Sequence, residues 1–312
     1  MKIFLLILTM HLLAVSLSWG SPTQTKFNSL VTSIESELKS YTGKQDQIDA
    51  LATSTLRQSL FSIQTLADLY SARYSALSEV WNRSKRLEDA IGAYRKTGEQ
   101  YAYAQKAGAS PATLAGLLKN KNQQRDQLMS FLDTAGWTHG TTIQRLKDIL
   151  SKTAWQSEAS DKKYSYSAME KQVRNIDTTD WDMTILEGGG IHDLRKAVRW
   201  YTLEMEALDD LIDIQDKTCN QGPILPTDPK SGGKCVISDC LHSQMLTIYD
   251  VFGSIKDIGE GQAGMGGEIP QEKLDEAASL YSETRKKKTF KILADEFQAC
   301  ANSLPEAQGA HE

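Results

Sequence analysis

The chain has 312 residues, of which 40% are hydrophobic and 24% are charged, and its formal net charge at pH 7 is −5. This length suits one large domain or two small ones and supplies ample sequence for a core. The acidic balance argues against a general nucleic-acid-binding protein, which requires a basic domain, although a local basic patch is compatible with an acidic total.

The first 20 residues are predicted to be a secretory signal peptide. Lys2 precedes an apolar run that reaches about Leu17, and Ser18 and Gly20 place small residues three and one before a cleavage point. The run is too short to span a bilayer comfortably, and polar sequence follows it at once. We therefore expect cleavage near Gly20 and a secreted or periplasmic mature protein without a membrane span.

In the N-terminal half, residues 21–155, apolar residues recur at helical spacing, and no segment shows the alternation of a convincing strand. Residues 45–92 contain no proline, and no glycine before Gly92, which predicts one very long helix or two nearly collinear helices. Ser110 and Pro111 fit an N-cap and the first residue of a helix. The helices expected in this half cover about 27–43, 45–92, 111–136 and 142–152.

The C-terminal half, residues 156–304, is also expected to be helical. Its expected helices cover about 164–175, 191–217, 236–252 and 270–303. A connector at 176–190 contains Trp181, the glycine-rich segment 259–267 is expected to be mobile, and the tail at 305–312 is expected to be disordered. The chain is therefore predicted to be all-α, either one helical bundle or two stacked antiparallel bundles with long helices.

The four cysteines Cys219, Cys235, Cys240 and Cys300 lie in the last third of the chain. An even number of cysteines in an exported chain favours two disulfides over a metal site. Cys219 and Cys235 flank a segment rich in proline and glycine, so the arrangement that we favour pairs them and joins Cys240 to Cys300. The other two connectivities remain open.

The most distinctive feature is the segment 188–199, in which three glycines precede the start of a cationic helix. The cationic residues that follow at helical spacing are His192, Arg195, Lys196 and Arg199. Positive side chains at a helix N-terminus oppose the helix dipole unless a negative group lies nearby. Free backbone N–H groups after Gly190 and the arginine forks together predict a site for phosphate or carboxylate. The simpler interpretation is a solvated charged face.

The run His192–Arg199 resembles the His-x-x-Arg-x-x-x-Arg/Lys signature of CHAD domains, the conserved histidine α-helical domains. That family consists of two similar helical bundles and binds inorganic polyphosphate through lysines, arginines and histidines on a central basic surface. The resemblance covers residues around 188–206. The positions that it implies as phosphate contacts are His192, Arg195, Lys196 and Arg199. A shorter similarity covers Lys85–Gly92, which resembles a segment after the first basic helix of that family.

Catalytic signals are poor. His139 and His242 have no partner that spacing identifies, and the pair Cys240-x-His242 alone is weak evidence for zinc. The chain contains no His-Glu-x-x-His motif, no serine elbow and no Walker-type loop. We therefore expect no catalytic residue, no metal and no cofactor. The remaining basic groups are expected to be solvent-facing helix charge: Arg73, Arg83, Lys85 and Arg86, then Lys162, Lys163, Lys171 and Arg174, then the run 285–288.

Two hypotheses of different classes follow. The first is an exported, non-catalytic protein that captures phosphate-rich polyanions, such as polyphosphate, on the basic helix face. The second is a structural or interaction protein of the cell envelope, whose partner is another envelope protein and whose basic cluster only forms ion pairs. Neither predicts a specific nucleic-acid partner. Carboxylates that saturate both Arg195 and Arg199 would favour the second, whereas a concave surface shared with other unpaired basic residues would favour the first.

Overall fold

The structure is a computed structural model that describes residues 21–41, 43–186, 188–208, 212–215, 235–263 and 268–304. The predicted signal peptide, Cys219 and the tail at 305–312 lie outside the described residues. Eleven helices and two short strands make up the regular structure of the described part, which confirms the prediction of an all-α protein. Among these residues, no helix combines the length and the apolar character that crossing a bilayer requires.

The N-terminal half consists of six helices. They are α2 (Pro22–Lys39), α3 (Gln47–Thr53), α4 (Leu56–Ser71), α5 (Leu77–Lys106), α6 (Pro111–Thr134) and α7 (Thr141–Lys152). The predicted start of α6 is confirmed, because the Ser110 hydroxyl accepts a hydrogen bond from the Thr113 N–H at 3.2 Å and Pro111 occupies the first turn. The predicted helix at about 142–152 is likewise confirmed as α7.

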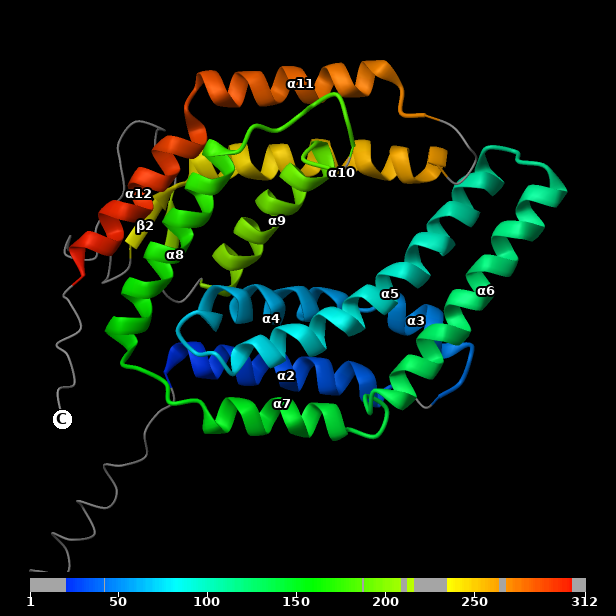
Figure 1. Ribbon diagram of the computed structural model, residues 1–312, viewed down its shortest axis with the longest axis horizontal. Coiled ribbons are helices and arrows are strands. Elements are labelled where there is room, and N and C mark those ends of the chain that lie inside the picture. Colours follow the sequence, from blue (N-terminus) through cyan, green and yellow to red (C-terminus); the bar gives the residue numbers. More distant parts are fainter. Residues whose placement is uncertain are drawn as a thin grey trace, which may run out of the picture.

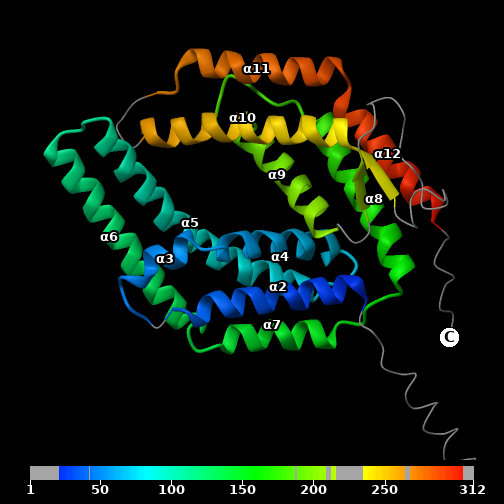
Figure 2. The same cartoon turned by 180° about the vertical axis from the view of Figure 1, so that it is seen from behind.

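The C-terminal half contains the other elements. They are α8 (Glu158–Thr178), α9 (Ile191–Ala207), β1 (Ile212–Gln215), β2 (Cys235–Ser238), α10 (Asp239–Ala263), α11 (Gln271–Lys286) and α12 (Thr289–Ser303). In Figure 1, α10 and α11 run along one edge of the molecule and α2, α4 and α7 along the other. The packed pair α8 and α12 joins these edges at one end, and α5 leads into α6 at the other. Seen from behind, α9 still crosses the middle between the two edges (Figure 2).

The prediction of one very long helix or two nearly collinear helices over 45–92 was wrong. These residues form α3, α4 and the first part of α5, which folds back along α4. Between α3 and α4, the Ser54 hydroxyl accepts a hydrogen bond from the Leu56 N–H at 3.2 Å. A second turn forms where the Tyr74 N–H donates to the Tyr70 carbonyl at 2.8 Å. Serine side chains can cap a helix, so a helix can end without proline or glycine.

The absence of strands was also predicted wrongly. Helix α9 ends at Ala207 rather than near 217, and β1 pairs in parallel with β2, with Ile212 opposite Cys235. Each strand has only 4 residues, too few to show a clear alternation in the sequence. The helix predicted from 236 therefore begins at Asp239.

The final helix, predicted over 270–303, is two helices. The chain turns between α11 and α12 at Lys288, whose φ of 57° lies in the left-handed region. The expectation of a mobile segment at 259–267 is wrong at its start, because residues 259–263 belong to α10. Gly259 lets two side chains pack closely on α10, since a Cβ at this position would lie 2.9 Å from the terminal methyl groups of both Ile269 and Leu186.

The disulfide pairing also differs from the one we favoured. Cys235 is bonded to Cys300, with their Cα atoms 5.9 Å apart. The predicted pair Cys240–Cys300 is therefore wrong, because β2 places Cys235 directly against α12. Cys240 also takes part in a disulfide, and Cys219 lies outside the described residues.

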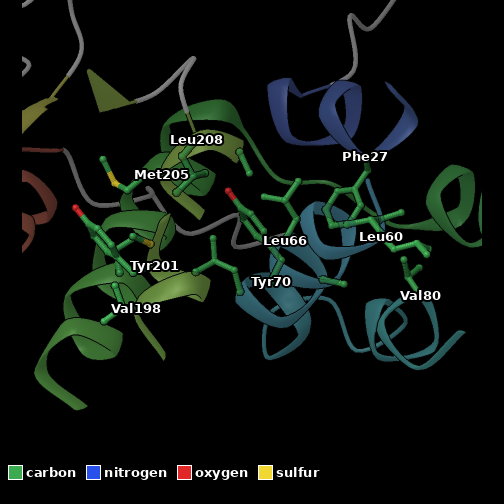
Figure 3. Close-up of a cluster of buried hydrophobic side chains, with 14 of the residues drawn as sticks. Phe27, Leu60, Leu66, Tyr70, Val80, Val198, Tyr201, Met205 and Leu208 are labelled. Atoms are coloured by element: carbon green, nitrogen blue, oxygen red, sulfur yellow. The ribbon is translucent and has the colours of Figure 1, made fainter. Parts of the chain in front are cut away.

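One hydrophobic cluster extends through both halves of the described chain. Figure 3 shows Tyr201 and Met205 of α9 near Leu66 and Tyr70 of α4, with Phe27 of α2 beyond them. This packing fixes the rotation of α9 about its axis, because its apolar stripe must face α4 and α10. The division near residue 155 stays a prediction.

Candidate functional site

The three glycines before α9 form a turn whose geometry favours glycine. Gly188 and Gly189 have φ values of 72° and 97°, which side chains rarely adopt. A Cβ on Gly190 would come within 2.1 Å of the Ile185 carbonyl oxygen. Gly190 is therefore a packing residue that lets the connector approach the start of α9.

The expectation of free N–H groups after Gly190 was wrong. The Ile191 N–H donates to the Ile185 carbonyl at 3.1 Å, and the His192 N–H donates to the Leu186 carbonyl at 2.7 Å. The connector thus satisfies donors that an anion would need. Asp193 in the first turn also accepts a hydrogen bond from the Gly189 N–H at 2.7 Å, so its carboxylate offsets the positive end of the helix. Any anion site must be built from side chains.

Those side chains line a pocket of about 420 Å³ between α4, α5, α9 and α10. Its lysine and arginine residues are Arg57 of α4, Lys85 and Arg95 of α5, Arg195, Lys196 and Arg199 of α9, and Lys256 of α10. Its acidic residues are Glu88, Asp89, Glu99 and Asp257. We call this the basic pocket, since cations outnumber carboxylates in it although the whole chain is acidic. His192 also lines it.

The carboxylates of the basic pocket are engaged by cations of the surrounding helices. The ion pairs are Arg57–Glu88 at 2.9 Å, Lys85–Glu88 at 3.3 Å, Lys85–Asp89, Arg95–Glu99 at 3.3 Å and Lys256–Asp257 at 3.5 Å. All of these carboxylates belong to α5 or α10. The cations of α9 therefore meet a pocket wall whose negative charge is already paired.

Arg195 and Arg199 are the exceptional cations of the pocket. Among the described residues neither forms an ion pair, and the buried Arg195 Nε has no hydrogen-bond partner. Each guanidinium lies on an aromatic ring instead: Arg195 is 4.9 Å from the Tyr249 ring centre, and Arg199 is 3.5 Å from that of Phe61. Burial lowers the pKa of Arg199 to about 10, and the positive charges of Arg57 and Arg195 add to this effect.

The other two predicted cations also reach this pocket. His192 is half-buried, with Nδ1 3.7 Å from the Asp193 carboxylate, and Lys196 is exposed. Lys85, from the segment with the shorter family resemblance, faces them across the pocket. By contrast, the Arg83 guanidinium forms an ion pair with Glu79 at 2.8 Å, in keeping with its expected surface role.

Sequence reasoning missed the contributions of α4 and α10. Two glycines in the middle of helices were the sequence signal that could have indicated these contributions. A Cβ on Gly253 of α10 would lie 3.2 Å from the Arg195 Nε, and one on Gly92 of α5 would lie 3.3 Å from the Arg57 Nη2. Since glycine weakens a helix interior, its presence at both places indicates that the guanidinium groups need the space.

Within the described part of the chain, no group of three or more histidine, cysteine or acidic side chains could hold a metal ion. No family model matches the chain, and no curated protein or solved structure is significantly similar to it. The similarity to CHAD domains therefore rests on the motif residues alone.

Proposed function

We propose that this protein is an exported, non-catalytic binding protein whose basic pocket captures phosphate-rich anions. The observation that carries the proposal is the environment of Arg195 and Arg199. Both are partly buried and have no carboxylate partner among the described residues, and the positive charges of Arg57 and Arg195 act on Arg199. Like charges that gather in a concave site destabilise one another unless an anion joins them.

The chemistry of the pocket suits phosphate oxygens. Each guanidinium offers planar, fork-shaped donors that match phosphate geometry, and Lys196 adds a compact charge at the exposed edge. The aromatic rings of Phe61 and Tyr249 hold the guanidinium planes in place, which reduces the entropy lost on binding. When protonated, His192 would add a further donor.

The ligand class follows from charge and size. A pocket of about 420 Å³ with cations contributed by four helices accommodates several phosphate groups. A short inorganic polyphosphate is the simplest such ligand, and the resemblance of His192–Arg199 to the CHAD signature supports the same class. Carboxylates that saturate both Arg195 and Arg199 would favour the competing hypothesis of a protein-interaction surface, and among the described residues neither arginine has such a partner.

Isothermal titration of the mature protein with sodium tripolyphosphate at low and high salt tests the proposal. We expect exothermic binding at low salt that weakens by about tenfold or more at high salt, because solvent ions screen charge–charge attraction. Arg195→Gln and Arg199→Gln should each weaken binding. Lys286→Gln removes the same charge from an exposed position on α11 and should not. An absence of heat at low salt would overturn the proposal.

A further inference from the structure

A second pocket, of about 440 Å³, lies between α4, α8, the connector after α8 and an adjoining face of α9. Ala197, Trp200 and Glu204 of α9 line it, at positions three and four residues apart, so they share one helix face. We call it the acidic pocket, because Asp68 and Glu204 line it and Lys171 is its one cationic lining residue among those described.

Glu204 is the unusual member of this pocket. Its side chain is only 3% exposed, and its Oε2 atom has no hydrogen-bond partner among the described residues. Burial raises the pKa of Glu204 well above its ordinary value, and the nearby Asp68 carboxylate adds to the shift. A buried carboxyl oxygen without a donor is costly, and native structures rarely keep one without a reason.

The walls of the acidic pocket are aromatic. Trp181 from the connector, Trp200 from α9 and Tyr164 from α8 all line it. The indole N–H of Trp181 donates to the Ile176 carbonyl at 3.0 Å, so that ring offers a ligand its apolar surface rather than a donor. Aromatic surfaces beside carboxyl groups are the combination that recognises organic cations, through the ring quadrupole and through charge.

We propose that the acidic pocket is a binding site for a small organic cation, an ammonium group that carries an apolar substituent. The ammonium N–H groups would supply the donor that Glu204 Oε2 lacks, and the substituent would pack against Trp181 and Trp200. The ionisable groups that surround Glu204 are Asp68 on α4, Tyr164 and Lys171 on α8, and its neighbour Tyr201 on α9. Only Lys171 opposes a cation, and it is exposed.

The test compares two probes of nearly the same shape, benzylammonium chloride and uncharged benzyl alcohol, on the full mature protein. Binding is followed by isothermal titration and by tryptophan fluorescence, since Trp181 and Trp200 both line the pocket. We expect benzylammonium to bind at least about tenfold more tightly than benzyl alcohol, which is the change expected when one charge-assisted hydrogen bond is lost.

Three variants define the site. Glu204→Gln keeps the shape but removes the charge, and should weaken benzylammonium by about tenfold. Glu206→Gln is the matched control, because Glu206 lies two positions away on the same helix, is exposed and does not line the pocket. Trp181→Leu keeps both carboxyl groups and should weaken binding several-fold.

The outcomes separate this proposal from the proposed function. Equal binding of the two probes, or unchanged benzylammonium affinity in both Glu204→Gln and Trp181→Leu, would overturn it. Tripolyphosphate binding by Glu204→Gln should equal that of the wild type, which also shows that the variant is folded. Failure of tripolyphosphate to bind the wild type would overturn only the basic pocket as an anion site.

Discussion

The basic and acidic pockets occupy adjoining faces of α9, and Trp200 lines both. Both pockets remove ionisable side chains from water within the same helix bundle, but the unfavourable free energy of burying a charge is reduced in a different way in each. In the basic pocket, Arg195 and Arg199 stay charged and lie on aromatic rings. In the acidic pocket, burial raises the pKa of Glu204 well above its ordinary value, which favours the protonated carboxyl group.

The difference follows from the chemistry of the side chains. A guanidinium group does not lose its proton near neutral pH even with its pKa lowered to about 10, so its charge has to be accommodated. A carboxyl group can discard its charge by taking up a proton. The positive charge of Arg199 is therefore present throughout the physiological pH range. An ammonium group that entered the acidic pocket would instead favour the ionised form of Glu204.

The largest effect is expected from the disulfide. Cys300 lies on α12, which packs on α8, and α8 supplies one wall of the acidic pocket but no residue of the basic pocket. Replacing Cys235 and Cys300 by serine opens a loop with a sequence separation of 65, and should lower the free energy of unfolding by about 4 kcal/mol. Urea denaturation measures the loss.

Ligand affinities of the same variant test whether the two pockets are independent. Below its unfolding transition, benzylammonium affinity should fall more than tripolyphosphate affinity, because α8 supplies lining residues to the acidic pocket alone among the two. Equal losses at both pockets would show that the comparison between them does not hold.

The second prediction concerns the paired arginines. The double variant Arg195→Gln, Arg199→Gln should weaken tripolyphosphate binding by about a hundredfold or more, since each charge-assisted contact is worth roughly 1.5–3 kcal/mol. Its free energy of unfolding should not fall, because the substitution removes neighbouring positive charges that lack carboxylate partners among the described residues. Titration calorimetry and urea denaturation measure the two quantities. A large loss of stability would show that both arginines serve mainly to hold the fold.

The third prediction uses the raised pKa of Glu204. In the unfolded chain this carboxyl group ionises near pH 4.3, whereas in the folded protein it keeps its proton to a higher pH. The stability associated with the protonated form is therefore complete below pH 4.3 and is lost as pH rises towards the folded pKa. Glu204→Gln escapes this loss and should be the more stable protein at pH 8 by about 1 kcal/mol or more.

Urea denaturation at pH 4.5 and pH 8 checks the sign, and the advantage of the variant should grow with pH. Glu268→Gln, at an exposed position before α11, is the control and should show no such trend. An advantage that is larger at the acidic pH would mean that Glu204 is ionised in the folded protein.

Much of the helical fold could be predicted, because its signals are local. The Ser110–Pro111 start of α6 and the apolar stripe of α9 depend on residues within one or two turns. The breaks around α4 interrupt an otherwise good helical sequence without a side-chain cap at the start of α4 or of α5, and the pairing of Ile212 with Cys235 is non-local. Neither leaves a periodic pattern to detect.

The candidate site divides in the same way. The cations of α9 were predictable because one motif contains them, but Arg57 and Tyr249 come from helices far away in the sequence. The sequence did not predict the burial of Glu204, because a glutamate in an amphipathic helix is normally on the surface. Only the packing of α9 among α4, α8 and α10 shows that the stretch from Tyr201 to Met205 is buried all round.

The smallest expected effect is also the most selective. A Cβ on Gly253 would lie 3.2 Å from the Arg195 Nε, so Gly253→Ala should push that guanidinium aside and weaken tripolyphosphate binding a few-fold, without changing benzylammonium binding. Gly98→Ala on α5 is the matched control, because its Cβ meets only the Lys121 Cε, at 3.9 Å. The control should gain about 0.5–1 kcal/mol of stability from helix propensity, whereas Gly253→Ala should gain less. If both variants bound tripolyphosphate as the wild type does, the position of Arg195 would not matter for the anion. The contrast between the buried cations of the basic pocket and the buried carboxyl group of the acidic pocket would then depend on Arg199 alone.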